Sequence, residues 1–164
     1  MRTVMTDDSA IRGKRPKPRR TTGIIGGAAA VLLIALAYLF IGNPVVAINN
    51  SKLKASITSI SSERVELNDV APFAWDAVYT FQPYADRSEI EETIGFKSNS
   101  IQETVSEGMV QLLFVKGERV VASVCGHAGA LGYRIEFPDR IVAGEHAGFD
   151  VKTEDAIVVL TLAS

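Results

Sequence analysis

The sequence predicts an α+β fold, a small antiparallel sheet of about four to six strands with one or two short helices, preceded by a single transmembrane helix. Three observations predict it. An uncharged apolar run occupies residues 23–41, short alternating apolar segments begin near residue 65, and one short helix is clearly signalled after residue 88. Strands that follow one another with few helices between them are typical of antiparallel α+β domains.

The apolar run, GIIGGAAAVLLIALAYLFI, predicts a helix that crosses a lipid bilayer. About 20 residues at roughly 1.5 Å each match the hydrocarbon thickness of a membrane. Before Gly23 there are seven basic and two acidic residues, a net charge of +5, and after Ile41 there are ten basic and seventeen acidic residues, a net charge of −7. By the positive-inside rule, the N-terminus is cytoplasmic and the acidic part lies outside the plasma (inner) membrane.

The chain divides into four predicted segments. These are a disordered basic tail (1–22), the transmembrane helix (23–42), a linker or amphipathic stalk (43–64) and an extracytoplasmic domain (65–164). In the stalk, Leu53, Ile57 and Ile60 have the spacing of a weakly amphipathic helix, which we expect to pack loosely on the domain. Gly23 and Gly27 form a G-x-x-x-G pair that favours helix pairing in the membrane, and the oligomeric state stays open.

The apolar run could be an uncleaved membrane anchor or a signal peptide that is removed. Small residues at positions 45–47 would permit signal cleavage after Ala47, which would release the domain. The run is longer than the apolar part of most cleavable signals, and Tyr38 and Phe40 suit the interfacial aromatic belt of a retained helix. The sequence therefore favours an uncleaved anchor.

The first part of the predicted domain contains a strand and a helix. Residues 75–81 predict a strand with Trp75, Ala77, Tyr79 and Phe81 on one face. In the helix that follows, Ser88 and Glu91 predict a capping box, and Gly95 predicts a left-handed C-terminal cap.

The second part contains only strands and loops. Residues 109–115 and 119–125 predict a hairpin with a short connection at 116–118, followed by a loop at 126–130. Apolar and charged residues alternate over 133–137, which predicts a half-buried strand. Residues 149–151 predict a short strand, and the continuous apolar residues 157–162 predict a central or doubly covered one.

The segment WDAVYTFQPY at residues 75–84, with the acidic helix and the hairpin after it, resembles small bacterial lipoproteins and membrane-anchored envelope proteins with a W-D-x-V-Y-x-F-x-P-Y motif. The likeness covers about residues 73–121. Those lipoproteins have a lipidated cysteine where this chain has an apolar run. The resemblance implies an envelope location and a fold, and it implies no activity and no catalytic residue.

Four residues of this motif, Trp75, Asp76, Tyr79 and Tyr84, are the candidate binding residues. An acid between two aromatic residues of a strand could orient a peptide or sugar. The competing interpretation, which we favour, is that Asp76 bonds nearby backbone while Trp75 and Tyr79 pack in the core.

Cys125 and His127 are the only thiol and one of two imidazoles, and together they suggest a nucleophile. They would point the same way only if the strand continued, and Gly126 predicts that it ends. His146 could complete three metal ligands, but the spacing fits no known template. The sequence thus predicts no catalytic residue, no metal and no cofactor.

Composition narrows the function further. The acidic net charge disfavours nucleic acid as a partner, and the chain contains none of the phosphate-loop, nucleophile-elbow or zinc-protease motifs. The primary hypothesis is a non-enzymatic, single-pass envelope protein whose outer domain binds a protein or cell-wall partner. The alternatives are a secreted inhibitor or immunity-type protein released after Ala47, and a thiol- or metal-dependent enzyme that uses Cys125 and His127.

Overall fold

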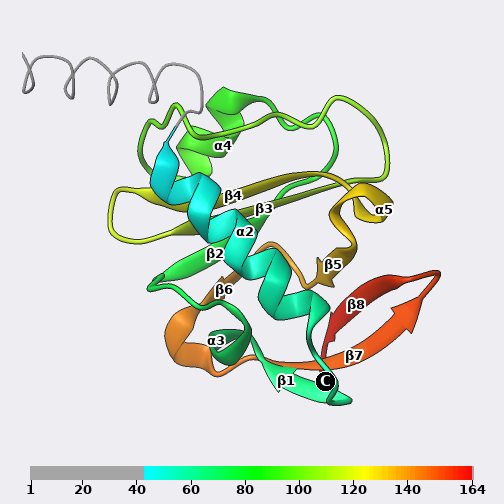
Figure 1. Cartoon of the computed structure of the whole chain (residues 1–164). Coiled ribbons are helices and arrows are strands. Elements are labelled where there is room, and N and C mark those ends of the chain that lie inside the picture. Colours follow the sequence, from blue (N-terminus) through cyan, green and yellow to red (C-terminus); the bar gives the residue numbers. More distant parts are fainter. Residues whose placement is uncertain (1–42, 164) are drawn as a thin grey trace, which may run out of the picture. The chain divides into compact units, whose positions relative to one another are not determined.

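A computed structural model of the chain describes residues 43–163 (Figure 1). The predicted basic tail and the apolar run lie outside the described residues. Within residues 43–163, no helix is both long enough and apolar enough to span a bilayer.

The described residues form helices and strands in mixed order. The helices are α2 (Pro44–Thr58), α3 (Leu67–Val70), α4 (Arg87–Ile94), α5 (Ala128–Leu131) and the 3-10 turn η1 (Ala143–Glu145). The strands are β1 (Arg64–Glu66), β2 (Ala77–Thr80), β3 (Met109–Val115), β4 (Val120–His127), β5 (Tyr133–Glu136), β6 (Arg140–Val142), β7 (Gly148–Glu154) and β8 (Ile157–Leu162).

The strands form two four-stranded sheets. Sheet A has the order β1-β7-β8-β5, and sheet B has the order β4-β3-β2-β6. All neighbouring strands are antiparallel except β5 and β8, which are parallel. The α+β class is confirmed, but the expected single antiparallel sheet is wrong. The strands β1 and β6 have three residues each, too few to show a period, and they form because strands distant in sequence pair with them.

Sheet B separates two apolar clusters. Leu112 and Phe114 face the main cluster, which extends to sheet A, whereas Leu113 and Val115 face a second cluster beneath α4. Successive strand residues point to opposite faces, so a strand covered on both sides must be apolar throughout. The β3 sequence MVQLLFV meets this requirement except at the buried Gln111, whose side chain donates a hydrogen bond to the Gln102 carbonyl.

The helix α2 belongs to the core, so the expectation of a loosely packed stalk is wrong. The side chains of Leu53 and Ile57 are fully buried in the main cluster. The helix begins earlier than expected, because Asn43 caps it by accepting a hydrogen bond from the Val45 N–H and because Pro44 occupies its first turn. Figure 1 shows α2 running across the domain beside β4.

The hairpin and the short helix are confirmed. Strands β3 and β4 pair antiparallel, and the Lys116 N–H donates to the Arg119 carbonyl in the turn. Gly95 ends α4 in the left-handed conformation, with φ of 84°. The N-terminal cap is Asp86 rather than Ser88, and its carboxylate accepts from the Glu89 N–H.

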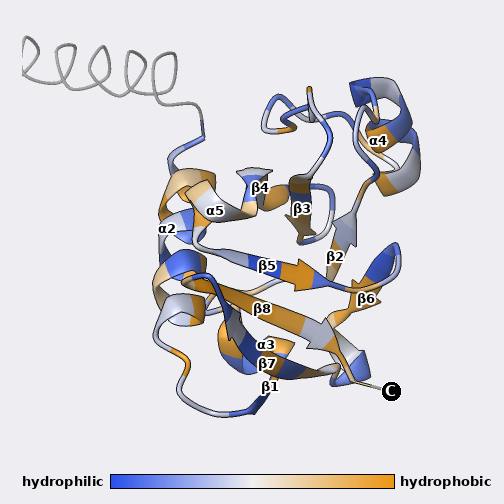
Figure 2. Ribbon diagram, turned by 90° about the vertical axis from the view of Figure 1, so that its right-hand side faces the viewer, coloured by the Kyte–Doolittle hydropathy of each residue, from blue (hydrophilic) through white to orange (hydrophobic). Residues whose placement is uncertain are grey.

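The strands near the C-terminus are confirmed with changed bounds. Strand β7 extends well beyond the expected residues 149–151, and β8 lies inside sheet A, as its continuous apolar sequence predicts. Figure 2 shows β8 as largely hydrophobic, whereas β5 alternates between hydrophilic and hydrophobic residues.

Candidate functional site

A groove lies along the outer edge of sheet B, between α2 and β4. Its volume is about 230 Å³. Its lining residues come from α2, β4, α5, β5 and the loop before β3, and they are Asn50, Ser51, Lys54, Gln102, Ser123, Val124, Cys125, Leu131 and Tyr133.

The groove exists because α2 occupies the place of a further strand. Strand β4 is an edge strand, so every second backbone group points away from β3. The Asn50 amide meets two of these groups: Nδ2 donates to the Ser123 carbonyl at 2.6 Å, and Oδ1 accepts from the Ser123 N–H at 2.9 Å. Asn49 Nδ2 donates to the Val121 carbonyl at 2.9 Å. Two side chains thus satisfy an edge that would otherwise be open.

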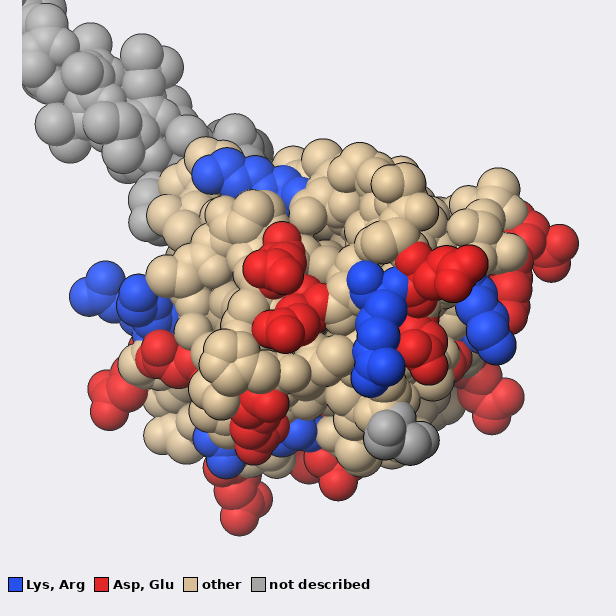
Figure 3. All heavy atoms as spheres, turned by 90° about the horizontal axis from the view of Figure 1, so that it is seen from below, with Lys and Arg blue, Asp and Glu red and all other residues tan. Residues whose placement is uncertain are grey.

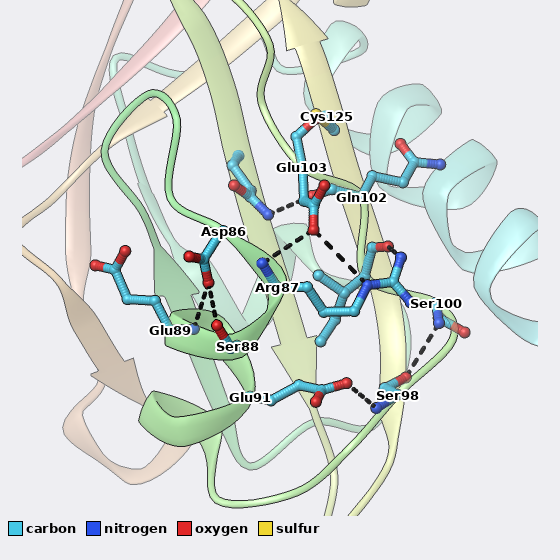
Figure 4. Close-up of polar contacts among 12 residues, drawn as sticks. Asp86, Arg87, Ser88, Glu89, Glu91, Ser98, Ser100, Gln102, Glu103 and Cys125 are labelled. Atoms are coloured by element: carbon cyan, nitrogen blue, oxygen red, sulfur yellow. Dashed lines mark hydrogen bonds and ion pairs between the residues drawn. The ribbon is translucent and has the colours of Figure 1, made fainter.

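The β4 edge continues past Ser123 toward Cys125, where α2 supplies no further asparagine. In an antiparallel ladder the outward-facing residues alternate, so Cys125 has the same backbone orientation as Ser123. Its thiol lies 3.7 Å from the Glu103 carbonyl, in the loop that crosses sheet B (Figure 4). Gln102, next to Glu103, is anchored through its carbonyl, which accepts from Gln111 Nε2 at 2.6 Å.

The polar groups of the groove are mostly neutral. The Ser123 hydroxyl is buried, with the residue 2% exposed, and it has no hydrogen-bond partner among the described residues. Lys54 supplies a cation, which donates to the Ala130 carbonyl at 3.4 Å. No carboxylate is among the lining residues in the described part of the chain. Lys54 is the charged hydrogen-bond donor that a ligand in the groove would meet.

Cys125 and His127 do share a face, because β4 continues through Gly126 to His127. The expected loop at residues 126–130 is therefore wrong. Each side chain has its own neutral neighbour: Cys125 has the Glu103 carbonyl, and His127 Nε2 lies 3.2 Å from the Ser106 hydroxyl. Burial raises the pKa of the Cys125 thiol, which disfavours the reactive thiolate. Among the described residues, the Cys125 thiol has a carbonyl and not a base as its polar neighbour.

The three candidate metal ligands do not come together. His146 Nδ1 lies 3.3 Å from a carboxylate oxygen of Glu66, beside sheet A, whereas Cys125 and His127 lie on sheet B. Over residues 43–163, no cluster of three or more metal-ligating side chains is found.

The four candidate binding residues serve different purposes. Trp75 is buried in the main cluster, edge-on to Phe114 with ring centroids 5.6 Å apart. Asp76 Oδ2 accepts from the Gly117 N–H at 2.6 Å and holds the turn of the hairpin. The Tyr79 ring packs at the second cluster, beneath the Arg140 guanidinium at 5.4 Å.

The prediction that Trp75 and Tyr79 share a face is wrong. Strand β2 begins only at Ala77, so Trp75 precedes the regular alternation and lies with the opposite cluster. Tyr84 stands apart in a loop, 61% exposed, with a positive φ of 69°. Its backbone N–H donates to the Thr104 hydroxyl at 2.9 Å. The motif therefore builds structure and does not assemble one binding site.

A second hollow, of about 450 Å³, lies beside α4 and is lined only by that helix and the residues just after it. Figure 4 shows two of its polar lining residues, Ser88 and Glu91, bonded to neighbours outside the lining. Glu91 accepts from the Ser98 N–H at 3.1 Å, and the N-terminal carboxylate of Asp86 accepts from the Ser88 hydroxyl. Hydrogen bonds from the Ser88 hydroxyl and from the Glu89 N–H lower the pKa of Asp86. The groove beside α2 is the better candidate because it retains an unpartnered group.

The sequence does not single out the groove residues Asn50, Lys54, Gln102 and Ser123. Asn43-Pro44 was an available signal, since a capping residue before a proline is typical of a helix start. It would have placed Asn49 and Asn50 on a packed helix.

Comparison with known proteins adds no assignment. No protein-family model, no curated protein and no solved structure matches this chain. The resemblance to membrane-anchored envelope proteins stays a prediction.

Proposed function

We propose that this chain is a single-pass protein of the plasma (inner) membrane whose extracytoplasmic domain binds an envelope partner, a protein or a cell-wall polymer, in the groove beside α2. The observation that carries the binding role is the groove itself together with Ser123, a lining residue whose buried hydroxyl has no hydrogen-bond partner among the described residues. A buried hydroxyl without a hydrogen bond is costly, and a ligand that displaces the groove side chains covering it would supply the bond.

The anchoring role is supported by the sequence. The apolar run of residues 23–41 separates a basic segment from an acidic one, which is the charge pattern of an N-terminus kept in the cytoplasm. The resemblance to small bacterial envelope proteins agrees with this location. Its motif also has a structural reading here, since Trp75 packs on Phe114 and Asp76 holds the hairpin turn.

The fold favours an anchored chain over one released after Ala47. Release there would remove the capping Asn43, Pro44 and the first turn of α2. It would also remove Val46, which is 8% exposed and packs in the second cluster. A secreted inhibitor would therefore begin with a frayed core helix.

The binding role is tested by photo-crosslinking in the native membrane. A photoreactive amino acid at Ser51, which lines the groove, is compared with one at Ala55, one turn further along α2 and outside the groove. We expect a specific adduct, peptide or glycan, at position 51 only. Equal adducts at both positions, or none at position 51, would contradict the proposal.

The same assay is repeated with Ser123→Ala. Because the hydroxyl has no internal partner among the described residues, its removal should leave the free energy of unfolding unchanged or slightly raised. We expect the adduct at position 51 to fall several-fold. An unchanged adduct would show that the hydroxyl does not contact the partner and would remove the observation on which the binding role depends.

A further inference from the structure

The first two turns of α2 expose large apolar side chains. Val45 is 52% exposed and Ile48 is 54% exposed. Residues three apart lie on the same side of a helix, so these two form one small apolar face. The residues after each of them, Val46 and Asn49, are buried against the domain. The apolar face therefore points away from the core.

The chain before α2 limits where this face can be. The apolar run ends at Ile41, and only Gly42 and Asn43 separate it from Pro44. Two extended residues span at most about 7 Å. The headgroup region on each side of a bilayer is about 5 to 8 Å thick. If the run spans the membrane, α2 must start within or just above the headgroups.

The charge of the segment around α2 also favours a position at the membrane surface. The chain has no Asp or Glu between Ser9 and Ser62, whereas the residues from Glu63 onward contain all the acidic groups of the domain. Lys52, four residues after Ile48, extends the outward face of α2 with an exposed cation. A lysine stem can lie along apolar surface while its ammonium group reaches phosphate.

Acidic residues also lie near the start of α2. Figure 3, seen from below, shows Asp and Glu side chains among several Lys and Arg side chains, and Figure 1 shows α4, which carries Glu89, Glu91 and Glu92, at the same upper side as the start of α2. The attraction to an anionic lipid surface therefore comes from α2 itself, which carries Lys52 and Lys54 and no acidic residue.

We propose that the face of α2 formed by Val45, Ile48 and Lys52 lies in the outer headgroup layer of the membrane that holds the chain's own anchor. This inference rests on the proposed anchoring role. It also sets the direction of the groove. At about 100° per residue, Asn50 and Lys54 lie on a different side of α2 from Ile48, so the groove opens away from the lipid.

The test uses the full chain reconstituted in vesicles of phosphatidylcholine and phosphatidylglycerol. A nitroxide label is attached to a single cysteine introduced by Val45→Cys, Ile48→Cys or Val105→Cys, each in a Cys125→Ser background. Val105 is the matched control, because it is 76% exposed and apolar. It also lies far from α2's start: Ser106 contacts His127, whereas Val46 packs with Val120 at the other end of β4.

The readout is the collision rate of the label with oxygen, which concentrates in lipid, and with a water-soluble nickel chelate. We expect oxygen to dominate at positions 45 and 48 and nickel to dominate at 105. Labels at 45 and 48 that are as open to nickel as the label at 105 would overturn the proposal.

Alkaline extraction of the same vesicles separates this proposal from the one on which it rests. If the chain resists extraction but the labels at 45 and 48 are accessible to the nickel chelate, the anchor is supported and the proposal of a lipid-facing surface is contradicted. A chain released by alkali contradicts the anchor, and the lipid-facing surface falls with it. Since all three positions are exposed, each variant should unfold at the same urea midpoint as its Cys125→Ser parent.

Discussion

The two sheets differ in how many of their faces are buried. Sheet B is buried on both faces: adjacent residues Leu113 and Phe114 of β3 are both fully inaccessible, yet they belong to different clusters. Sheet A has one covered face and one wet face, so in β5 the buried Tyr133 and Ile135 alternate with the charged residues Arg134 and Glu136.

The comparison teaches how much each face contributes to stability. In sheet B the residues Leu112 to Val115 of the interior strand β3 are held by packing on both faces, and part of the β4 edge is satisfied by the side chains of α2. In sheet A the outer face is held by surface ion pairs, which are weak because water screens them. Replacing a residue by a charged one should therefore be costly at nearly every position of β3, but at only alternate positions of β5.

The largest effect is expected for truncations in β3. Phe114→Ala should lower the free energy of unfolding by about 3–5 kcal/mol and Leu113→Ala by about 2–5 kcal/mol, because each leaves a cavity. Urea unfolding measures both. A cost below about 1 kcal/mol for Leu113→Ala would show that the second cluster does not pack tightly, and the contrast between the sheets would fail.

The next effect is a pH dependence at Tyr133. Burial raises the pKa of Tyr133 to about 12, from 10.0. The neutral phenol is therefore favoured by folding, and this contribution, roughly 3 kcal/mol at about 1.4 kcal/mol per pKa unit, is present below pH 10 and is lost as the pH rises toward 12.

Tyr133→Phe should remove this part of the alkaline destabilisation. Urea unfolding between neutral pH and pH 12 measures it, with tyrosinate absorbance as a direct check on ionisation. An unchanged alkaline transition in the variant would assign the effect to another group.

A smaller effect is expected at the edge of sheet B. Asn50→Ala removes both hydrogen bonds to the Ser123 backbone and should cost about 1–3 kcal/mol. Ser51→Ala is the matched control, since its hydroxyl bonds only the Ala47 carbonyl within α2 and its loss should stay within about 0.5 kcal/mol. Equal costs for the two would mean that α2 does not complete the sheet.

The smallest effect is expected on the wet face of sheet A. Arg134 pairs with Glu136 at 2.8 Å and with Glu154 at 3.6 Å, and all three side chains are well exposed. Arg134→Ala should cost no more than about 1 kcal/mol, and high salt should reduce the difference. A larger, salt-independent cost would instead indicate packing by the arginine stem.

Local sequence signals were sufficient for elements whose hydrogen bonds join residues that are close in the sequence. Gly95 predicts the end of α4 because its left-handed conformation disfavours other residues, and the β3–β4 hairpin needs only two apolar runs and a short turn. Short strands such as β1 carry no such signal. Arg64–Glu66 becomes a strand because β7, some eighty residues later, offers a partner.

The candidate site could not be predicted from local sequence signals for a related reason. An asparagine in a helix normally indicates solvent, whereas Asn49 is buried because it replaces a missing strand. The groove joins residues as distant as Asn50 and Ser123. Cys125 was singled out for its chemistry, and it does line the groove, but its contacts there are neutral and structural.

The way α2 joins the domain also determines how the domain would bear a mechanical load. Tension applied to the chain ahead of Asn43 would reach α2 at its first residue. The helix is fixed along its length, by Asn49 and Asn50 to β4 and by Leu53 and Ile57 to the core. These contacts share the load and must yield together. Pulling on the predicted anchor would therefore strain the centre of the fold and would not merely stretch a linker.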